Sequence, residues 1–404
     1  MPRLTAIDRE ALPVGERRFH DAVKAIRRRP VSGPFIVLMN SSPDLAARFA
    51  HLGHYFHSRG QADESILPLR ARAFVALIGS RALDVPYEWA AWVGWALEAG
   101  VPQETADAIR EGRAAPNLTA EEALVADFCT QLASGSHRVS NATFNAALAH
   151  FGTQGLLELV VTLGYFTMIA LPLNAFEIEM SDAQISLRKP FAPLRVQRKS
   201  GVDPDVRRDK LLPLSGANKA APRVALLASH ADVAPEHQHF VDRILRTRGT
   251  LSNVFQVLLH APDAAERIAH VGAFFLYESL LPDSVRTLIA LTAARELDCG
   301  YIWAAHKGEF GTEGLARELV AALERGQLPE GSTSQQKAVY RFCLQLLRGD
   351  HHVDEPTYRA AIEHFGVAGT VQIAAMLGYF AMIAFVANAF NVPPPDSSDP
   401  RAAF

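Results

Sequence analysis

Apolar residues along this chain recur mostly at spacings of three and four, which is the period of an amphipathic α-helix. Residues 69–83 and 285–297 show this spacing clearly, with arginines on the opposite face. Residues 156–176 form the most apolar stretch, and a similar stretch lies near the C-terminus. No alternating apolar–polar run is long enough to indicate a sheet. The pattern therefore predicts an all-α protein.

Capping residues mark the ends of several expected helices. Ser140 precedes one amphipathic segment as an N-cap, and Gly152 follows it as a C-cap. A similar segment has Pro356 in its first turn and Gly366 at its end. Together with the apolar spacing, these signals predict about six to eight helices in each half of the chain.

The hydrophobic pattern of the first half returns in the second half. Residues 67–92 align without a gap on residues 281–306, and the register continues through paired FC-x-QL, HFG and LGYF segments. Each repeat is as long as a domain and much longer than the repeat of a solenoid protein. The sequence therefore predicts two tandem domains related by an internal repeat.

Composition places the domain boundaries. Domain 1 is predicted at residues 1–180 and domain 2 at residues 226–395. The residues between them, 181–225, are rich in proline, arginine and lysine and have no helical stripe, which predicts a basic linker. Residues 396–404 are predicted to form a disordered tail.

Charge and cysteine content limit the functional classes. A formal net charge of −3 gives no electrostatic reason to expect nucleic acid or an anionic membrane as partner. Three cysteines are not a disulfide framework and suit a reducing compartment. The N-terminus lacks a signal-peptide core, and residues 156–176 contain Glu158, Pro172 and Asn174, so we expect a buried helix and not a membrane span. A soluble cytoplasmic protein is the expectation.

One pair of repeated segments carries the candidate chemistry. DVPYEWAAWVG at residues 84–94 and DCGYIWAAHKG at residues 298–308 share Asp, Tyr, Trp, Ala-Ala and Gly. They differ where reactive groups are expected. The second copy has Cys299, Ile302 and His306 where the first has Val85, Glu88 and Trp92.

The order of these elements resembles the carboxymuconolactone decarboxylase family, which includes the alkylhydroperoxidase D-like proteins. The resemblance rests on a Leu-Pro start, an amphipathic helix, Y-x-W-A-A-H and a long GYF-x-MIA helix with Asn, and it covers most of the chain in two copies. It implies all-α domains that assemble into ring-like oligomers, so a homo-oligomer is expected. In the decarboxylases the motif histidine is thought to handle protons as CO₂ leaves a lactone acid. In the peroxidases a Cys-x-x-Cys followed by His carries thiol chemistry.

This chain departs from both family patterns. Domain 2 has Cys299 and His306 at the first-cysteine and histidine positions, but Ile302 replaces the second cysteine. The glutamate of the peroxidase proton relay would fall at Thr287 or Ala73 and is absent. Domain 1 has neither cysteine nor histidine in its motif. The resemblance therefore implies that domain 2 holds the active site, and that the site of domain 1 is degenerate with a tryptophan in the histidine's place.

Helix geometry separates the two candidate catalytic residues. Cys299 and His306 are seven residues apart, which puts them on one helix face but ~10 Å apart along its axis. That separation is too long for a direct Cys–His pair. With Asp298 as helix cap, Cys299 would lie in the first turn, where the dipole lowers a thiol pKa; a buried core thiol is the alternative. His306, with a reference pKa of about 6.5, is the better proton carrier, and a hydrogen-bonded core histidine is its alternative.

Four further residues are predicted to line a pocket near His306. Trp303 and Tyr301 flank it in sequence, with core aromatics as the alternative interpretation. His270 and Tyr379 recur in the repeat and are interpreted as pocket-facing or structural polar groups.

Two other sets of residues could form a site. Glu88 survives only in domain 1 and His306 only in domain 2, so a shared site between domains would need these helices to be close; two distant remnants are the favoured alternative. His51, His54 and His57 fan over roughly 120° of a helix without a carboxylate at a metal-like interval, which argues against a metal site.

Three functions stay open on these residues. The first is a cofactor-free decarboxylase or isomerase that acts on a small lactone or carbonyl acid, with His306 as proton donor or acceptor. The second is a peroxide-reducing thiol antioxidant that uses Cys299. The third is a non-catalytic oligomeric scaffold or ligand-binding protein. A small molecule is the expected partner, with no cofactor and no metal.

Overall fold

The computed structural model describes residues 3–57, 65–178, 214, 221–307 and 317–395. These residues contain sixteen α-helices and no β-strand, so the predicted all-α class is confirmed. Most of the predicted linker and the whole predicted tail lie outside the described residues. The helices form two groups of eight, which matches the expected number of helices for each half.

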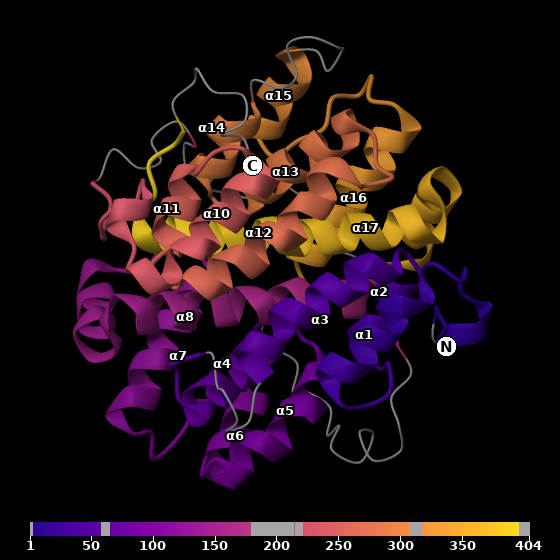
Figure 1. Ribbon diagram of the computed structural model, residues 1–404. Helices are drawn as coiled ribbons and strands as arrows, with labels where there is room; N and C mark the ends of the chain where they lie inside the picture. Colours follow the sequence, from indigo (N-terminus) through magenta and orange to yellow (C-terminus); the bar gives the residue numbers. More distant parts are fainter. Residues whose placement is uncertain (1–2, 58–64, 179–213, 215–220, 308–316, 396–404) are drawn as a thin grey trace.

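The N-terminal group occupies one side of the molecule, in indigo to magenta in Figure 1. Its helices are α1 (Arg17–Arg27), α2 (Pro34–Met39), α3 (Pro43–His57), α4 (Leu69–Ala82), α5 (Pro86–Glu98), α6 (Gln103–Arg110), α7 (Ala120–Ala133) and α8 (Asn141–Phe176).

The C-terminal group occupies the other side, in red to yellow. Its helices are α10 (Gln238–Arg248), α11 (Asn253–Leu258), α12 (Pro262–Tyr277), α13 (Asp283–Glu296), α14 (Gly300–His306), α15 (Arg317–Glu324), α16 (Ser334–Leu347) and α17 (Glu355–Phe390).

The predicted capping residues act as expected, with one difference. The Ser140 hydroxyl accepts a hydrogen bond from the backbone N–H of Thr143 at the start of α8, and Pro356 lies in the first turn of α17. Gly152 and Gly366 have φ of 66° and 64°, and each interrupts its helix. The chain then turns back into helix, so these glycines kink α8 and α17 and do not end them.

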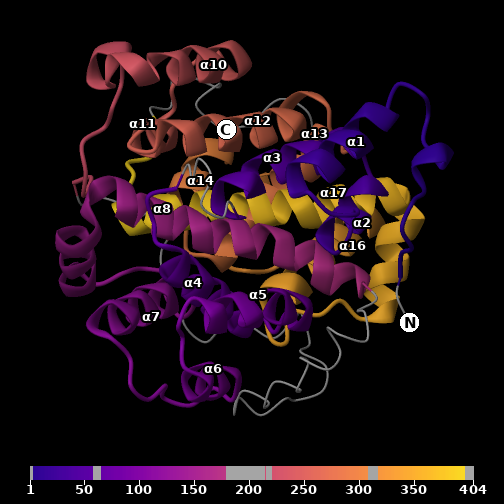
Figure 2. The same cartoon turned by 60° about the horizontal axis from the view of Figure 1, so that its bottom comes forward.

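The two longest helices, α8 and α17, form the centre of the molecule. Figures 1 and 2 show them side by side, in magenta and yellow, with the other helices around them. Gly164 of α8 faces Met382 of α17, and Gly378 of α17 faces Met168 of α8. Because glycine has no side chain, the two backbones approach closely at both places.

Both central helices have the length and composition of a membrane span. The most apolar 18-residue window of each is 100% buried inside the protein. The prediction that residues 156–176 form a buried helix is therefore confirmed. Two such buried helices are only weak evidence about a membrane.

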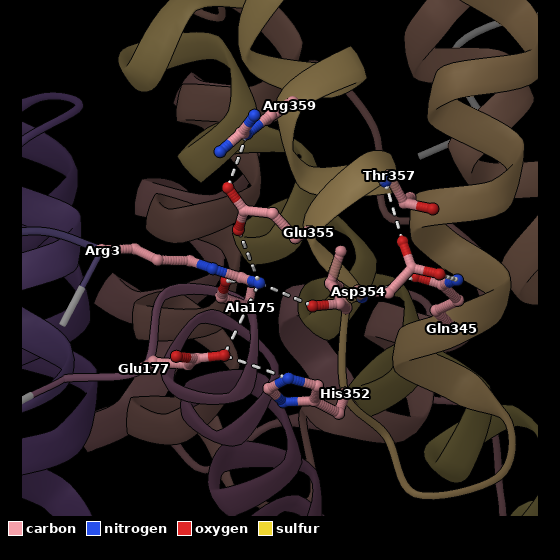
Figure 3. A network of polar contacts seen from close by, with 10 residues as sticks. Arg3, Ala175, Glu177, Gln345, His352, Asp354, Glu355, Thr357 and Arg359 are labelled. Carbon is pink, nitrogen blue, oxygen red and sulfur yellow. Dashed lines mark hydrogen bonds and ion pairs between the residues drawn. The ribbon is translucent and has the colours of Figure 1, made fainter. Parts of the chain in front are cut away.

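Arg3 ties the N-terminus to both helix groups (Figure 3). Its side chain donates to the carbonyl oxygen of Ala175 at the end of α8 (2.8 Å) and to that of Val353 just before α17 (2.9 Å). Its guanidinium also lies 4.3 Å from the ring centre of Tyr358.

Arg223 makes the same set of contacts as Arg3, with the N-terminal and C-terminal helix groups exchanged. Its side chain donates to the carbonyl oxygen of Ala389 at the end of α17 (2.9 Å) and to that of Val139 just before α8 (2.8 Å). Its guanidinium lies 4.6 Å from the ring centre of Phe144. These reciprocal contacts lock the two helix groups together at both ends of the central pair.

Candidate functional site

Cys299 and His306 lie at opposite ends of α14. Cys299 itself is the N-cap residue, with extended backbone and no side-chain cap bond. The expectation that Asp298 caps this helix is therefore wrong. Asp298 has φ of 48°, and its carboxylate accepts a hydrogen bond from Arg295 at 2.6 Å instead. This buried ion pair holds the Asp298 side chain away from the helix N-terminus.

The environment of Cys299 disfavours a thiolate. The residue is fully buried, and burial raises the pKa of its thiol to about 11 against smaller opposing effects of backbone N–H groups and Arg138. Cys129 and Cys343 are also buried and free, and burial raises the pKa of both thiols. All three sulfurs therefore belong to the core, which for Cys299 was the alternative interpretation of the sequence.

We expect all three cysteines to be unreactive in the folded protein. A thiol reagent at about pH 8 should modify none of them until denaturant is added, because the thiolate is scarce and access is closed. The measurement is the rate of reaction with Ellman's reagent with and without guanidinium. Dimedone labelling of Cys299 in folded, peroxide-treated protein would contradict this expectation.

His306 is buried in the C-terminal group. Its side chain is in contact with Phe380 of α17, with the two ring centres 5.3 Å apart and the rings nearly perpendicular. Phe380 in turn contacts Tyr379, whose hydroxyl accepts a hydrogen bond from Arg248 (2.9 Å). A series of ring contacts thus joins the predicted histidine to the predicted Tyr379.

Trp303 and Tyr301 lie in the core around α14. The Tyr301 hydroxyl accepts a hydrogen bond from the backbone N–H of Val254 at the start of α11 (3.4 Å). Burial raises the pKa of this hydroxyl to about 12. These contacts favour the interpretation of Tyr301 as a core aromatic that links α14 to α11.

Glu88 lies in a buried cluster of the N-terminal group. Its carboxylate accepts a hydrogen bond from Trp92 and is near the positive charge of Arg29. Trp92 lies against the ring of His57, with ring centres 5.1 Å apart. His57 also contacts Tyr165 (5.6 Å), so α3, α5 and α8 bring three ionisable groups into one aromatic environment.

The burial of this cluster shifts the pKa of each ionisable group. Burial raises the pKa of Glu88 to about 7, and Arg29 and Trp92 oppose the rise. Burial lowers the pKa of His57 to about 4, while its bond to the carbonyl oxygen of Gly53 acts in the opposite direction. Burial and the charge of Glu88 raise the pKa of Tyr165 well above its usual range. No hydrogen-bond partner for the Tyr165 hydroxyl lies within the described residues.

The structure does not bring Glu88 and His306 together. Figure 1 places α5 and α14 on opposite sides of the central helices α8 and α17. The groups that shift the pKa of Glu88 all belong to the N-terminal group. The alternative that Glu88 and His306 lie far apart is therefore correct, and the motif helices α5 and α14 lie in separate environments.

His51 and His270 meet where α3 packs on α12. Their ring centres are 6.3 Å apart. Arg48 donates to the carbonyl oxygen of His270 (3.1 Å), and Arg267 donates to that of His51 (2.6 Å). Burial chiefly lowers the pKa of both histidines, that of His51 to about 4, and the neighbouring arginines lower it further. Both imidazoles are therefore neutral near pH 7.

His270 also lines a cavity of about 600 Å³ beside α3, α10 and α12. Arg48, Arg246 and Arg248 line it as well, so the structure gathers three arginines around a predicted site residue. His306 is not among its lining residues. Sequence reasoning missed these arginines, although one of them, Arg48, has an equivalent in Arg267, at the same place of the repeated segments PDLAARFAHLG and PDAAERIAHVG.

No group of three or more metal-binding side chains that could hold a metal ion occurs in the part of the chain that the structure describes. Of the three histidines on α3, His51 faces α12 and His57 faces the aromatic cluster. The helix therefore directs them to different neighbours.

No family model matches this chain, and no curated protein or solved structure was found to match it. The resemblance to the carboxymuconolactone decarboxylase family therefore rests on the residues of the sequence alone.

Proposed function

We propose that this chain is a carboxymuconolactone decarboxylase-like enzyme that transfers protons without a cofactor, in the decarboxylation or isomerisation of a small lactone or carbonyl acid. The observation that carries the proposal is the buried carboxyl group of Glu88, whose pKa of about 7 suits a general acid–base at neutral pH. Its neighbours Tyr165, which is buried, and His57, which is half-buried, are also ionisable groups of the same cluster.

The chemistry of decarboxylation fits these groups. Loss of CO₂ from a carbonyl acid leaves an enolate, which must receive a proton at carbon and needs hydrogen-bond donors at oxygen. Glu88, whose pKa burial raises to about 7, supplies or accepts the proton. The Tyr165 hydroxyl, which has no partner among the described residues, donates to the enolate oxygen.

His306 is the second proton carrier in this proposal. It occupies the histidine position of the motif, and the resemblance implies a proton-handling role there. In this arrangement each helix group has one acid–base residue on its motif helix, Glu88 on α5 and His306 on α14. Domain 1 is then not a degenerate copy but a site with a carboxyl group in place of the imidazole.

The tandem organisation belongs to the same proposal. The exchanged contacts of Arg3 and Arg223, and of Arg48 and Arg267, support two related domains that pack as a pair. Assembly of this pair into a larger homo-oligomer, a cytoplasmic location and a small molecule as partner complete the proposal.

A non-catalytic scaffold is the alternative with an observation in its favour. His306 is 2% exposed and its ring packs on Phe380, as a structural histidine would. The thiol antioxidant is disfavoured, because Cys299 is fully buried and the pKa of its thiol is raised.

The experiment compares Glu88→Gln and His306→Ala with the unmodified protein on small lactone and carbonyl acids. The measurements are CO₂ release and exchange of the carbon-bound proton with D₂O. We expect Glu88→Gln to lower the rate by about 10²–10⁴-fold, since a positioned acid–base group contributes this much. If His306→Ala alone removes the activity, the proton carrier is His306; if neither substitution lowers it, the proposal is wrong.

Stability against pH provides an independent readout for Glu88. Its folded-state pKa is raised from 4.5 to about 7, so the folded protein holds a proton that the unfolded chain loses. Its contribution to stability is full below about pH 4.5 and is lost as pH rises through about 7. At about pH 8, Glu88→Gln is therefore expected to be more stable than the unmodified protein by roughly 3 kcal/mol.

The control is Glu98→Gln on the exposed end of the same helix, which should leave the pH dependence of unfolding unchanged. Urea unfolding at several pH values measures both variants. Equal pH slopes for Glu88→Gln and the unmodified protein would show that the carboxyl group is not held protonated.

A further inference from the structure

The cavity beside α3, α10 and α12 lies away from the Glu88 cluster and is lined mainly by polar side chains. Its volume is about 600 Å³, within the usual range of small-molecule pockets. Figures 1 and 2 show α10 and α12 together on the outer side of the C-terminal group, with α3 next to α12. Its lining residues are Arg48, Arg246, Thr247, Arg248, Gly249, His270, Ala273, Tyr277 and Glu278.

The charge of Arg48 is already balanced inside the protein. Its guanidinium donates to the carboxylates of Asp44 and Glu278, both at 2.6 Å. It also donates to the carbonyl oxygen of His270. Arg48 therefore fixes the wall of the cavity and has little positive charge left for a ligand.

Arg248 differs because no carboxylate pairs with it in the described residues. Its side chain is 6% exposed, and within the described residues it donates only to neutral oxygens, the Tyr379 hydroxyl (2.9 Å) and the carbonyl of Ala269 (3.3 Å). Its Nε has no hydrogen-bond partner in that part of the chain, and the guanidinium stacks on Phe255 at 4.2 Å. A buried arginine without a counter-charge is costly, and a bound anion would remove that cost.

Close packing holds the Arg248 guanidinium in place. A side-chain carbon added at Gly272 would lie 2.0 Å from Nη2 of Arg248 and 2.3 Å from the Tyr379 hydroxyl oxygen. Glycine at this position therefore lets the arginine and the tyrosine meet beside α12. A guanidinium fixed in this way loses little conformational freedom when it binds a planar anionic group.

The remaining lining residues complete the surroundings of an anion. Arg246 is exposed, one turn from Arg243 on α10, and has no ion-pair partner within the described residues. His270 is neutral near pH 7 and can donate from its imidazole N–H. Tyr277 is 66% exposed and offers an aromatic ring at the edge of the cavity.

We infer that this cavity binds a small molecule through a carboxylate or phosphate group held by Arg248 and Arg246. The arginine fork matches the oxygen pairs of both groups, and the Tyr277 ring is placed to cover an apolar or planar part of the ligand. Arg48 comes from α3 and the other arginines come from α10, so the cavity is lined by both helix groups. This inference is independent of the proton transfer proposed for Glu88 and His306.

The test is a titration of the full chain with inorganic phosphate and, separately, with succinate, at constant ionic strength, followed by calorimetry. Arg246→Ala removes an exposed positive charge without disturbing the core, and we expect it to weaken binding about tenfold, the loss of one charge-assisted contact. Arg248→Lys keeps the buried charge but removes the fork, and it should also weaken binding. Stronger binding of one probe identifies whether the natural group is a phosphate or a carboxylate.

Two further variants act as controls: one should leave binding unchanged, and the other should strengthen it. Arg243→Ala changes the net charge equally and lies on the same helix outside the cavity lining, so binding should be unchanged. Glu278→Gln removes the negative charge of the lining and should strengthen binding, because Arg48 then has one carboxylate partner fewer. If neither probe binds the unmodified protein, or if Arg243→Ala weakens binding as much as Arg246→Ala, the inference is overturned.

Discussion

Replacing Glu158 with alanine is expected to destabilise the protein by about 3–5 kcal/mol, because the substitution leaves several buried donors without an acceptor. Glu158 is fully buried in α8. Its carboxylate accepts hydrogen bonds from the hydroxyls of Tyr55 (2.8 Å) and Ser65 (2.6 Å) and from the side chain of Gln154 (3.0 Å). The backbone N–H of Leu67 completes the set at 3.3 Å.

The chain contains a natural control for this prediction. Gln372 takes the corresponding place in α17, where its amide oxygen accepts from the Ser279 hydroxyl (2.9 Å) and from the backbone N–H of Leu280 (2.8 Å). An amide oxygen therefore suffices for two donors at that site. At position 158 the Gln oxygen can keep the donors Ser65 and Leu67, and its NH2 meets the Tyr55 hydroxyl and the Gln154 amide, which can both turn to accept, so Glu158→Gln should cost less than about 2 kcal/mol. Urea unfolding monitored by circular dichroism measures both variants. An equal loss for Gln and Ala would mean that the negative charge itself is required.

The helical fold could be predicted from local patterns because the apolar spacing and capping residues of each helix lie within a short stretch of sequence. Ser140 and the apolar spacing after it are neighbours in the chain, and they set the start of α8 without help from the rest of the protein. The contacts that join the helix groups are different in kind. Arg3 bonds to Val353 and Arg223 bonds to Val139, and no local pattern specifies such distant pairs.

The same limit applies to the candidate site. The motif comparison singled out Glu88 and His306, but their surroundings come from helices far away in sequence, such as α3 and α8 for Glu88. The expectation that Cys299 lies in the first turn of α14 is wrong, because Arg295 binds the Asp298 carboxylate that was expected to cap this helix. No sequence pattern singled out Arg248. It differs from the other arginines because no carboxylate pairs with it in the described residues, and only the packing of the helices shows this.

Gly378→Ala is expected to destabilise the protein by about 2–3 kcal/mol, because it forces the two central helices apart. A side-chain carbon at Gly378 would lie 2.7 Å from Cα and 2.8 Å from the carbonyl oxygen of Met168 in α8. Backbone atoms inside a helix cannot move aside singly, so α17 must shift as a whole. The added methyl would otherwise favour the helix, so the measured loss understates the steric cost.

Two glycines of the same chain separate the steric effect from helix propensity. Gly94 lies within α5, and no atom of another described element lies within 4 Å of an added carbon, so Gly94→Ala should stabilise the protein by about 0.5–1 kcal/mol. Gly164→Ala would meet Met382 first at its flexible side chain, at 2.5 Å from Cγ, and should cost less than Gly378→Ala. Thermal and urea unfolding rank the three variants. If Gly378→Ala stabilises the protein as Gly94→Ala does, α8 and α17 do not pack as closely as described. The contacts of Arg3 and Arg223 at the two ends of this helix pair would then have to hold the two helix groups together without that close packing.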